Sequence, residues 1–153
     1  MAVESTNSQL KLDADIAVMQ RQLDGQKAEG ELQLIALRNE LVERAIRGLV
    51  GRNPVLTGES RGDWKAFVNS MGAERVHNPE LLDPDGSSTI REMEAVLHSA
   101  PTYCEIWLSN VTPYIVLLEE GRSDKSPDGI LRSTVQELTA VLRSQRNLAL
   151  VAT

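Results

Sequence analysis

One stretch of the chain decides its fold: residues 106–132, with the sequence IWLSNVTPYIVLLEEGRSDKSPDGILR. The apolar residues at its start predict a strand, and Pro113 suits the first turn of a short helix that is expected to end at Glu120. Gly121 and Gly129 then bound a polar loop, after which a second helix is expected. The stretch contains no metal-binding, phosphate-binding or nucleophile signature. It therefore indicates a polar loop held at a defined place on a rigid frame.

A long helix is predicted before this stretch and another at its end. Residues 31–50 carry apolar side chains over roughly half of the helix circumference, a width typical of a helix that packs against a sheet. Gly51 and Pro54 fit the usual end of such a helix. The last helix is predicted over residues 127–147. Four apolar residues at helical spacing are expected to form its buried face: Leu131, Val135, Leu138 and Leu142.

Two strands are predicted between the long helices, at residues 61–70 and 102–109, where β-branched and aromatic residues gather. Residues 71–88 are rich in Gly, Asn, Pro and Asp and predict a loop. Thr89 is expected to be the N-cap of a short helix, with Glu92 completing a capping box. These elements predict an α+β fold, in which a small antiparallel sheet packs against a long N-terminal helix and a C-terminal helix.

The chain is expected to have one domain with extensions at both ends, since its 153 residues suffice for a single core. Residues 1–28 are predicted to be a partly helical N-terminal arm, residues 29–147 the α+β domain, and residues 148–153 a tail that forms a short strand or a frayed end. The arm either folds back on its own domain or docks on a neighbouring subunit. Its amphipathic part, expected to end where Gly25 and Gly30 interrupt the pattern, is marked by four apolar residues: Leu12, Ile16, Met19 and Leu23.

Composition excludes several classes of function. A net charge of -6 argues against a general nucleic-acid binder, because neutralising phosphates requires clustered Lys and Arg. Aromatic residues make up 3% of the chain, too few for base-stacking platforms. The sequence predicts no signal peptide and no membrane-spanning stretch, so synthesis in the cytoplasm is expected.

No reactive constellation is evident either. His77 and His98 are far apart and lack neighbours at metal-ligand spacing, so no metal site is expected. No histidine motif accompanies Ser60, Ser123 or Cys104, and the lone cysteine is expected to be a structural thiol. The sequence therefore predicts neither an enzyme nor a bound cofactor.

Three segments carry a resemblance to a known family. Residues 53–64, NPVLTGESRGDW, are similar to the bacteriophage pattern Thr-Pro-Val-Asp-Thr-Gly-Arg-x-Arg-x-Asn-Trp, with different residues at positions 53, 56, 59 and 63. The loop at residues 85–89 and the series from Asn110 to Gly129 resemble later segments of the same family. The three segments occur in a consistent order between about residues 30 and 145. In the first segment the shared residues are Pro54, Val55, Thr57, Gly58, Arg61 and Trp64.

The chain thus resembles the minor tail protein Z and tail-completion group of long-tailed bacteriophages. This resemblance implies a structural protein of the virion neck, made in the host cytoplasm, that completes the tail and joins it to the head connector as a ring. The expected partners are copies of itself, six to match the tail symmetry, the connector or head-completion protein, and the tail terminator or tail tube protein. Genomic DNA would pass through without sequence-specific binding, and no membrane is involved.

Two alternatives stay open beside the neck protein. The first alternative is a tail terminator that caps the tail tube. The second is a phage-encoded adaptor or regulator that binds a host protein through the helix at residues 9–24. In any of these roles we expect contacts between proteins to matter more than chemistry.

Six residues are the interface candidates. Trp64 is expected to be a core anchor. Glu119, near Arg122 and Arg132, either forms an ion pair between subunits or is a solvated or locally paired carboxylate. The loop at residues 121–129 carries both charge signs, which at a subunit boundary would specify register and in a plain surface loop would simply be solvated. The candidates are Arg61, Trp64, Glu119, Arg122, Asp124 and Lys125.

Overall fold

The computed structural model describes residues 2–71 and 75–151, with side chains over residues 13–71 and 75–145. The chain divides into two compact units, residues 1–37 and residues 38–153. The helix α1, Ala2–Arg52, contributes residues to both. The predicted boundary at residue 28 therefore falls inside α1.

The first unit consists of the N-terminal part of α1. Gly25 and Gly30 do not interrupt the helix, so that prediction was wrong. A glycine inside a helix costs backbone entropy but keeps its hydrogen bonds, and two isolated glycines do not end a helix of this length. Every described side chain from residue 13 to residue 30 is exposed except that of Ala17, which is half-buried. No side of this helical segment is covered within the described part of the chain.

Replacing both glycines with alanine tests how strongly they weaken the arm. A Cβ at Gly25 or Gly30 would meet no atom within 4 Å, so alanine fits without strain. Each substitution is expected to stabilise the helix by about 0.5–1 kcal/mol. The double variant G25A/G30A should show higher helix content by far-UV circular dichroism during the early part of a thermal melt. Equal or lower helicity than the parent would contradict this reading of the arm.

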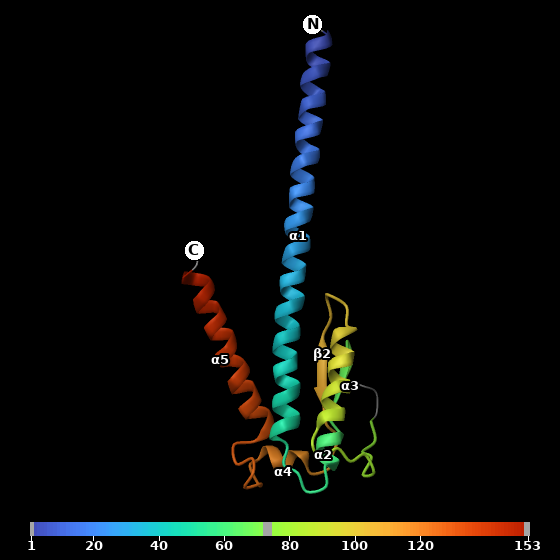
Figure 1. Ribbon diagram of the computed structural model, residues 1–153, viewed down its shortest axis with the longest axis vertical. Coiled ribbons are helices and arrows are strands. Elements are labelled where there is room, and N and C mark those ends of the chain that lie inside the picture. Colours follow the sequence, from blue (N-terminus) through green and yellow to red (C-terminus); the bar gives the residue numbers. More distant parts are fainter. Residues whose placement is uncertain (1, 72–74, 152–153) are drawn as a thin grey trace. The chain divides into compact units, whose positions relative to one another are not determined.

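The second unit contains the remaining elements and confirms the predicted α+β class, with a small antiparallel sheet and helices at both ends of the sequence (Figure 1). Both strands are shorter than predicted. The start of the first predicted strand forms a helical turn instead. The elements after α1 are α2 Glu59–Gly62, β1 Lys65–Val68, α3 Ser87–His98, β2 Ile106–Ser109, α4 Ile115–Glu119 and α5 Ile130–Val151.

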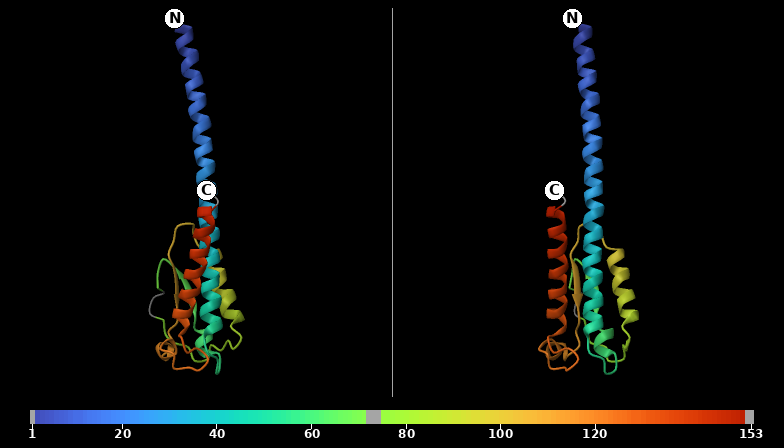
Figure 2. Two further views of the ribbon diagram at one scale, coloured as in Figure 1. Left: turned by 90° about the vertical axis from the view of Figure 1, so that its left-hand side faces the viewer. Right: turned by 60° about the vertical axis from the view of Figure 1, so that its left-hand side comes forward.

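The sheet consists of β1 and β2, which pair antiparallel (Figure 2). Ala66 lies opposite Leu108, and Phe67 lies opposite Trp107. Because successive side chains in a strand point to opposite faces, Ala66 and Leu108 share one face and the two aromatic residues share the other. The first pair contacts the core, whereas Trp107 remains 39% exposed.

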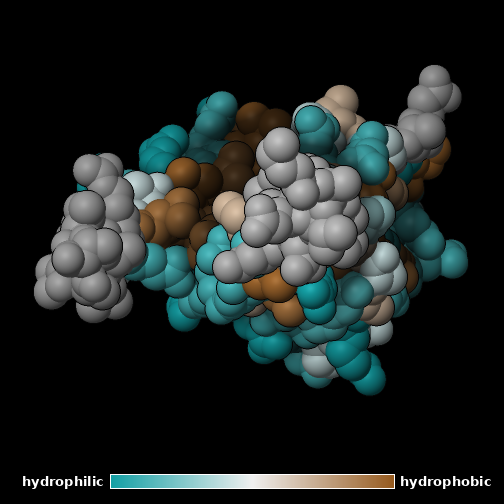
Figure 3. All heavy atoms as spheres, turned by 90° about the horizontal axis from the view of Figure 1, so that it is seen from above, coloured by the Kyte–Doolittle hydropathy of each residue, from teal (hydrophilic) through white to brown (hydrophobic). Residues whose placement is uncertain are grey.

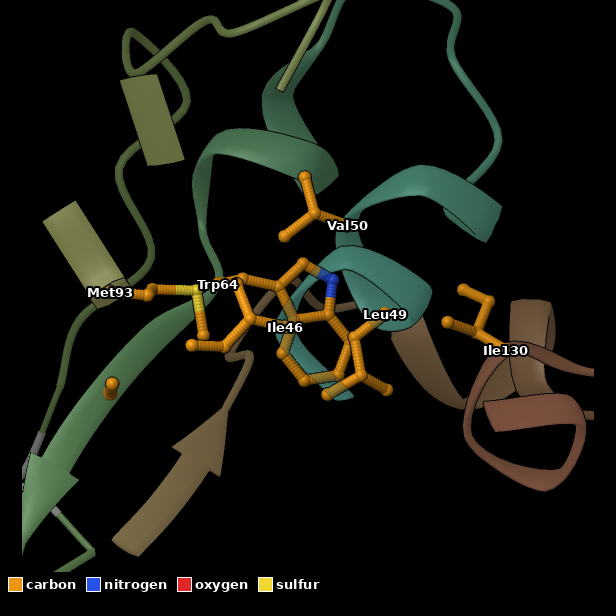
Figure 4. Packing of buried hydrophobic residues seen from close by; sticks show 7 residues of the cluster. Ile46, Leu49, Val50, Trp64, Met93 and Ile130 are labelled. Carbon is orange, nitrogen blue, oxygen red and sulfur yellow. The ribbon is translucent and has the colours of Figure 1, made fainter. Parts of the chain in front are cut away.

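The core joins every layer of this unit (Figure 4). Trp64, just before β1, is 6% exposed, and its ring lies among side chains from three helices. This burial confirms its predicted role as a core anchor. The other buried members of the cluster are Ile46, Leu49 and Val50 from α1, Ala66 from β1, Met93 from α3 and Ile130 from α5.

The start of α3 differs from the prediction. Gly86, with φ 76°, occupies the N-cap position, and no side chain caps the helix from there. Thr89 lies inside the first turn, where its backbone N–H donates to Asp83 Oδ2 at 2.7 Å. The carboxylate that compensates the helix N-terminus thus precedes the helix, and the predicted capping box of Thr89 and Glu92 was wrong.

The exposed face of α5 also corrects the prediction. Among its described side chains, Ile130 and Thr134 are buried, whereas Leu131 is 53%, Val135 49% and Leu142 45% exposed and Leu138 is half-buried. The helix is rotated by about one residue from the predicted orientation, which leaves most of the predicted core stripe at the surface. Residues 148–151 continue α5, so neither a strand nor a frayed end begins at residue 148.

Candidate functional site

The loop between α4 and α5 is closed by the helix ends that flank it. The Glu119 carboxylate, at the end of α4, accepts hydrogen bonds from the backbone N–H groups of the first three residues of α5: Ile130 at 2.8 Å, Leu131 at 2.6 Å and Arg132 at 3.0 Å. A carboxylate at this place satisfies donors that have no partner inside the helix and interacts favourably with the helix dipole. Glu119 therefore fixes where α5 starts.

Two glycines allow the ends of the loop to approach closely. Gly121 and Gly129 have φ values of 77° and 81°, in the left-handed region that favours glycine. A Cβ at Gly121 would collide with the carbonyl oxygen of Pro127, and one at Gly129 would lie 2.5 Å from the carbonyl oxygen of Glu119. Inside the loop the Ser126 N–H donates to the Ser123 carbonyl at 2.9 Å. The polar loop is therefore held at a defined place, as its sequence indicates.

Glu119 forms no ion pair among the described residues and is not a solvated carboxylate, while its predicted pair with an arginine of a neighbouring subunit stays a prediction. The two Glu119 oxygens accept backbone hydrogen bonds instead, and Arg122 pairs with Glu120 at 3.3 Å. That pair is 68% and 52% exposed, so solvent screens it and its contribution to stability is small. The charge of Arg122 remains at the surface of the loop.

A groove of about 500 Å³ separates this loop from the segment that follows α1. Its lining includes Tyr114 and three interface candidates, Arg122, Asp124 and Lys125. The Lys125 ammonium donates to the Val55 carbonyl at 3.3 Å and so links the two walls. Burial raises the pKa of the Tyr114 hydroxyl above its usual value, and the charge of Glu59 raises it further, so the phenol stays neutral. The groove offers both charge signs to a partner.

Arg61 is not part of the groove lining and forms hydrogen bonds inside the fold. Its guanidinium donates to three backbone carbonyls, those of Pro84 at 2.7 Å, Asn53 at 2.8 Å and Gly51 at 3.2 Å. These bonds tie the end of α1 to the loop before α3. The sequence suggested Arg61 as an interface residue, and the structure uses its two terminal nitrogens within the chain, while its buried Nε has no partner among the described residues.

A polar cluster next to α2 was not predicted. His77 lies between two carboxylates, with Nδ1 3.2 Å from Asp63 Oδ2 and Nε2 2.6 Å from Glu59 Oε1. Asp63, which is 2% exposed, also accepts hydrogen bonds from Arg75 at 3.1 Å and from the Thr112 hydroxyl at 3.2 Å. The members come from three segments, α2 with the residue after it, residues 75–77 and Thr112, and only the fold brings these segments together.

The cluster holds its charges in place and leaves no free base. Both ring nitrogens of His77 face carboxylates, so neither is open to take a proton from a substrate. Burial opposes protonation of His77, but the hydrogen bonds to Asp63 and Glu59 and the charges of both groups outweigh it and raise its pKa above 6.5. Among the described residues, no group of three or more His, Cys, Asp or Glu side chains is arranged to hold a metal ion.

The cluster predicts a pH-dependent contribution to stability. Because the pKa of His77 is higher in the folded state, its contribution is fully present below pH 6.5 and is lost as the pH rises through the folded-state pKa. Urea titrations should therefore show that His77→Asn lowers the free energy of unfolding more at pH 6 than at pH 8.5.

His98 provides the matched control for this measurement. It bonds to Glu43 at 2.7 Å but is 56% exposed, so His98→Asn should have little effect at either pH. If His77→Asn were equally destabilising at both pH values, the charge bridge would not contribute in the way described.

Comparisons with known proteins give no relative: no family model, no curated protein and no solved structure matches the chain. A search of the described residues found no helix of the length and apolarity needed to cross a membrane. The geometry described above and the resemblance of the sequence therefore carry the functional argument.

Proposed function

We propose that the chain is a structural protein of the bacteriophage neck, which completes the tail and joins it to the head connector as a ring of subunits. The observation that carries this proposal is the ordered resemblance between residues 53 and 129. Six copies would match the symmetry of the tail. Genomic DNA would pass through the ring without sequence-specific binding.

The roles of the shared residues support the proposal. Gly58 has φ 93°, and a Cβ there would lie 2.5 Å from the backbone of Pro84. The Asn110 side chain donates to the Ser60 carbonyl at 2.7 Å, and Glu119 caps α5. Residues that a family shares because they hold turns and helix ends are those expected for a frame that presents loops to partners.

The loop between α4 and α5 is the proposed contact surface of this frame. Arg122, Asp124 and Lys125 place both charge signs on one wall of the groove. At a boundary between subunits, such a mixture specifies the register of the contact more than it adds affinity. The acidic net charge of -6 would keep DNA from adhering to the ring.

Deleting the gene and imaging the resulting particles tests this function. A neck protein should leave filled heads and finished tails that are not joined, and electron microscopy of intact particles should show its side-chain density at the neck. Tails of abnormal length would assign the chain to the tail terminator instead. Normal, infectious particles without the protein would reject both structural roles.

The adaptor role is favoured by one observation, the exposure of the arm on all sides between residues 13 and 30. An adaptor would use this helix to bind a host protein and would be absent from purified particles. A neck protein would be present in every particle, so mass spectrometry of purified virions separates the two hypotheses.

A further inference from the structure

Two apolar stripes of this chain have the same length and spacing. On α1, the stripe is Leu12, Ile16, Met19 and Leu23, and on α5 it is Leu131, Val135, Leu138 and Leu142. Each follows the steps i, i+4, i+7 and i+11, so each lies along one side of its helix over three turns. Such a stripe is stabilised when another apolar surface covers it.

Leu12 lies outside the described side chains, and the other members of both stripes are exposed except Leu138, which is half-buried. On α1, Ile16 is 44%, Met19 61% and Leu23 62% exposed. On α5, Leu131 and Val135 are each about half exposed. Each stripe thus exposes several apolar side chains in a row along its helix, and contiguous apolar surfaces mark contacts with other proteins.

The α5 stripe borders an apolar trough in the second unit. The trough has a volume of about 360 Å³, and its lining includes Leu131, Val135 and Leu138 on one side and Leu108 and Leu49 on the other. Figure 3 shows apolar side chains, in brown, gathered in the hollow beside α5. A concave apolar surface of this kind fits an amphipathic helix laid along it.

An antiparallel arrangement aligns all four apolar positions of the two stripes. In antiparallel helix pairs, positions from one end of the first stripe meet those from the opposite end of the second. No apolar residue is then left without a counterpart. The four layers would be Leu12 with Leu142, Ile16 with Leu138, Met19 with Val135, and Leu23 with Leu131.

The charges beside the stripes favour the same arrangement. On α1, Asp13 and Asp24 directly follow the first and last apolar residues of the stripe. On α5, Arg132 and Arg143 occupy the same two places and are exposed. Antiparallel pairing brings these flanks to the same side, with Asp24 near Arg132 and Asp13 near Arg143. A parallel pairing would place them on opposite sides, so charge complementarity selects the antiparallel register.

We propose that the arm of one copy of this chain packs antiparallel against α5 of a second copy, with the stripe of the arm covering the α5 stripe. This deepens the proposed function, because each subunit then offers one arm and one acceptor surface, a head-to-tail contact that generates a ring when the rotation closes. The occupant is a second copy of this chain, since the complementary spacing and charges both come from its own sequence.

Disulfide cross-linking between two variants tests the register. One chain carries Met19→Cys and the other Val135→Cys, both with Cys104→Ser to remove the natural thiol. Both positions are exposed, so the substitutions should leave the fold intact. After mixing under oxidising conditions, the disulfide-linked heterodimer should be at least about tenfold more abundant than with Leu142→Cys in place of Val135→Cys. The shifted cysteine lies seven residues, about 10 Å, farther along the helix and beyond disulfide reach.

Charge reversal provides the second test. Adding Asp13→Arg and Asp24→Arg to the Met19→Cys chain should lower the heterodimer yield about tenfold, because like charges then face each other. Adding Arg132→Asp and Arg143→Asp to the Val135→Cys chain should restore it. Yields that do not depend on register or on these charges would overturn the proposal.

Occupation by the chain's own arm gives a different result. A single chain carrying both cysteines would then form an internal disulfide at every dilution, while the mixture of single variants would give no heterodimer, and the proposal would be overturned. The virion experiment is independent of this one. If the heterodimer forms in the expected register but the protein is absent from particles, the contact is supported and the neck function is rejected. If joining of heads and tails requires the protein but no heterodimer forms, the neck function is supported and the contact is rejected.

Discussion

Trp64→Ala is expected to lower the free energy of unfolding by about 3–5 kcal/mol. The indole ring is 6% exposed and belongs to the cluster that joins α1, the sheet, α3 and α5. Its removal would leave a cavity at the point where these elements meet, and the surrounding helices can close only part of it. Equilibrium unfolding in urea, followed by far-UV circular dichroism, gives the change directly.

Two further variants separate packing from the chemistry of the indole. Trp64 Nε1 is buried and has no hydrogen-bond partner among the described residues, so phenylalanine removes an unsatisfied donor along with some apolar area. Trp64→Phe should therefore cost much less, about 1–2 kcal/mol. Trp107→Ala is the matched control, because Trp107 is 39% exposed on the outer face of the sheet. Equal losses for Trp64→Ala and Trp107→Ala would contradict the assignment of Trp64 to the core.

The fold class and the core could be predicted because both depend on local patterns. Apolar residues at helical spacing predicted the part of α1 that enters the core and the position of α5. Trp64 was predicted to be a core residue because it is an aromatic residue at a helix–strand junction. The strand ends were predicted less well. Residues 59–62 form the helical turn α2 because Gly58 adopts a left-handed backbone conformation, which sequence alone does not specify.

The rotation of α5 shows where periodicity stops being sufficient. Two faces of α5 have residues at the same helical spacing. One contains Ile130 and Thr134, and the other, which is more apolar, contains Leu131 and Val135. The structure buries the first, because the cap at Glu119 fixes how α5 leaves the loop. The face that pattern alone selects for the core is therefore the face left open at the surface.

The sequence named charged residues for the candidate site but could not tell which of them the fold itself uses. Arg122, Asp124 and Lys125 lie on one wall of a groove, and their contact with a partner stays a prediction. Arg61 and Glu119 instead bond to the backbone of their own chain. A charged residue near a turn looks the same in sequence whether it faces a partner or caps a helix, and only the folded backbone decides which donors and acceptors it meets.

Glu119→Ala is expected to lower the free energy of unfolding by about 2–3 kcal/mol. The substitution removes one carboxylate that accepts three backbone hydrogen bonds at 2.6–3.0 Å, so three donors at the start of α5 lose their partner together. Glu119→Gln should also destabilise the fold, because its amide keeps a single acceptor oxygen and turns an N–H group toward backbone donors.

The neighbouring carboxylate is the control that isolates the cap. Glu120 is exposed, and its one ion pair within the described residues is with the exposed Arg122. Glu120→Ala should therefore change the free energy of unfolding by less than about 0.5 kcal/mol. Urea unfolding of both variants under identical conditions compares two neighbouring glutamates, of which only Glu119 accepts hydrogen bonds from the start of α5. If Glu119→Ala were as mild as Glu120→Ala, the loop between α4 and α5 would be held by its glycines and internal turns, and its fixed position would not depend on the cap.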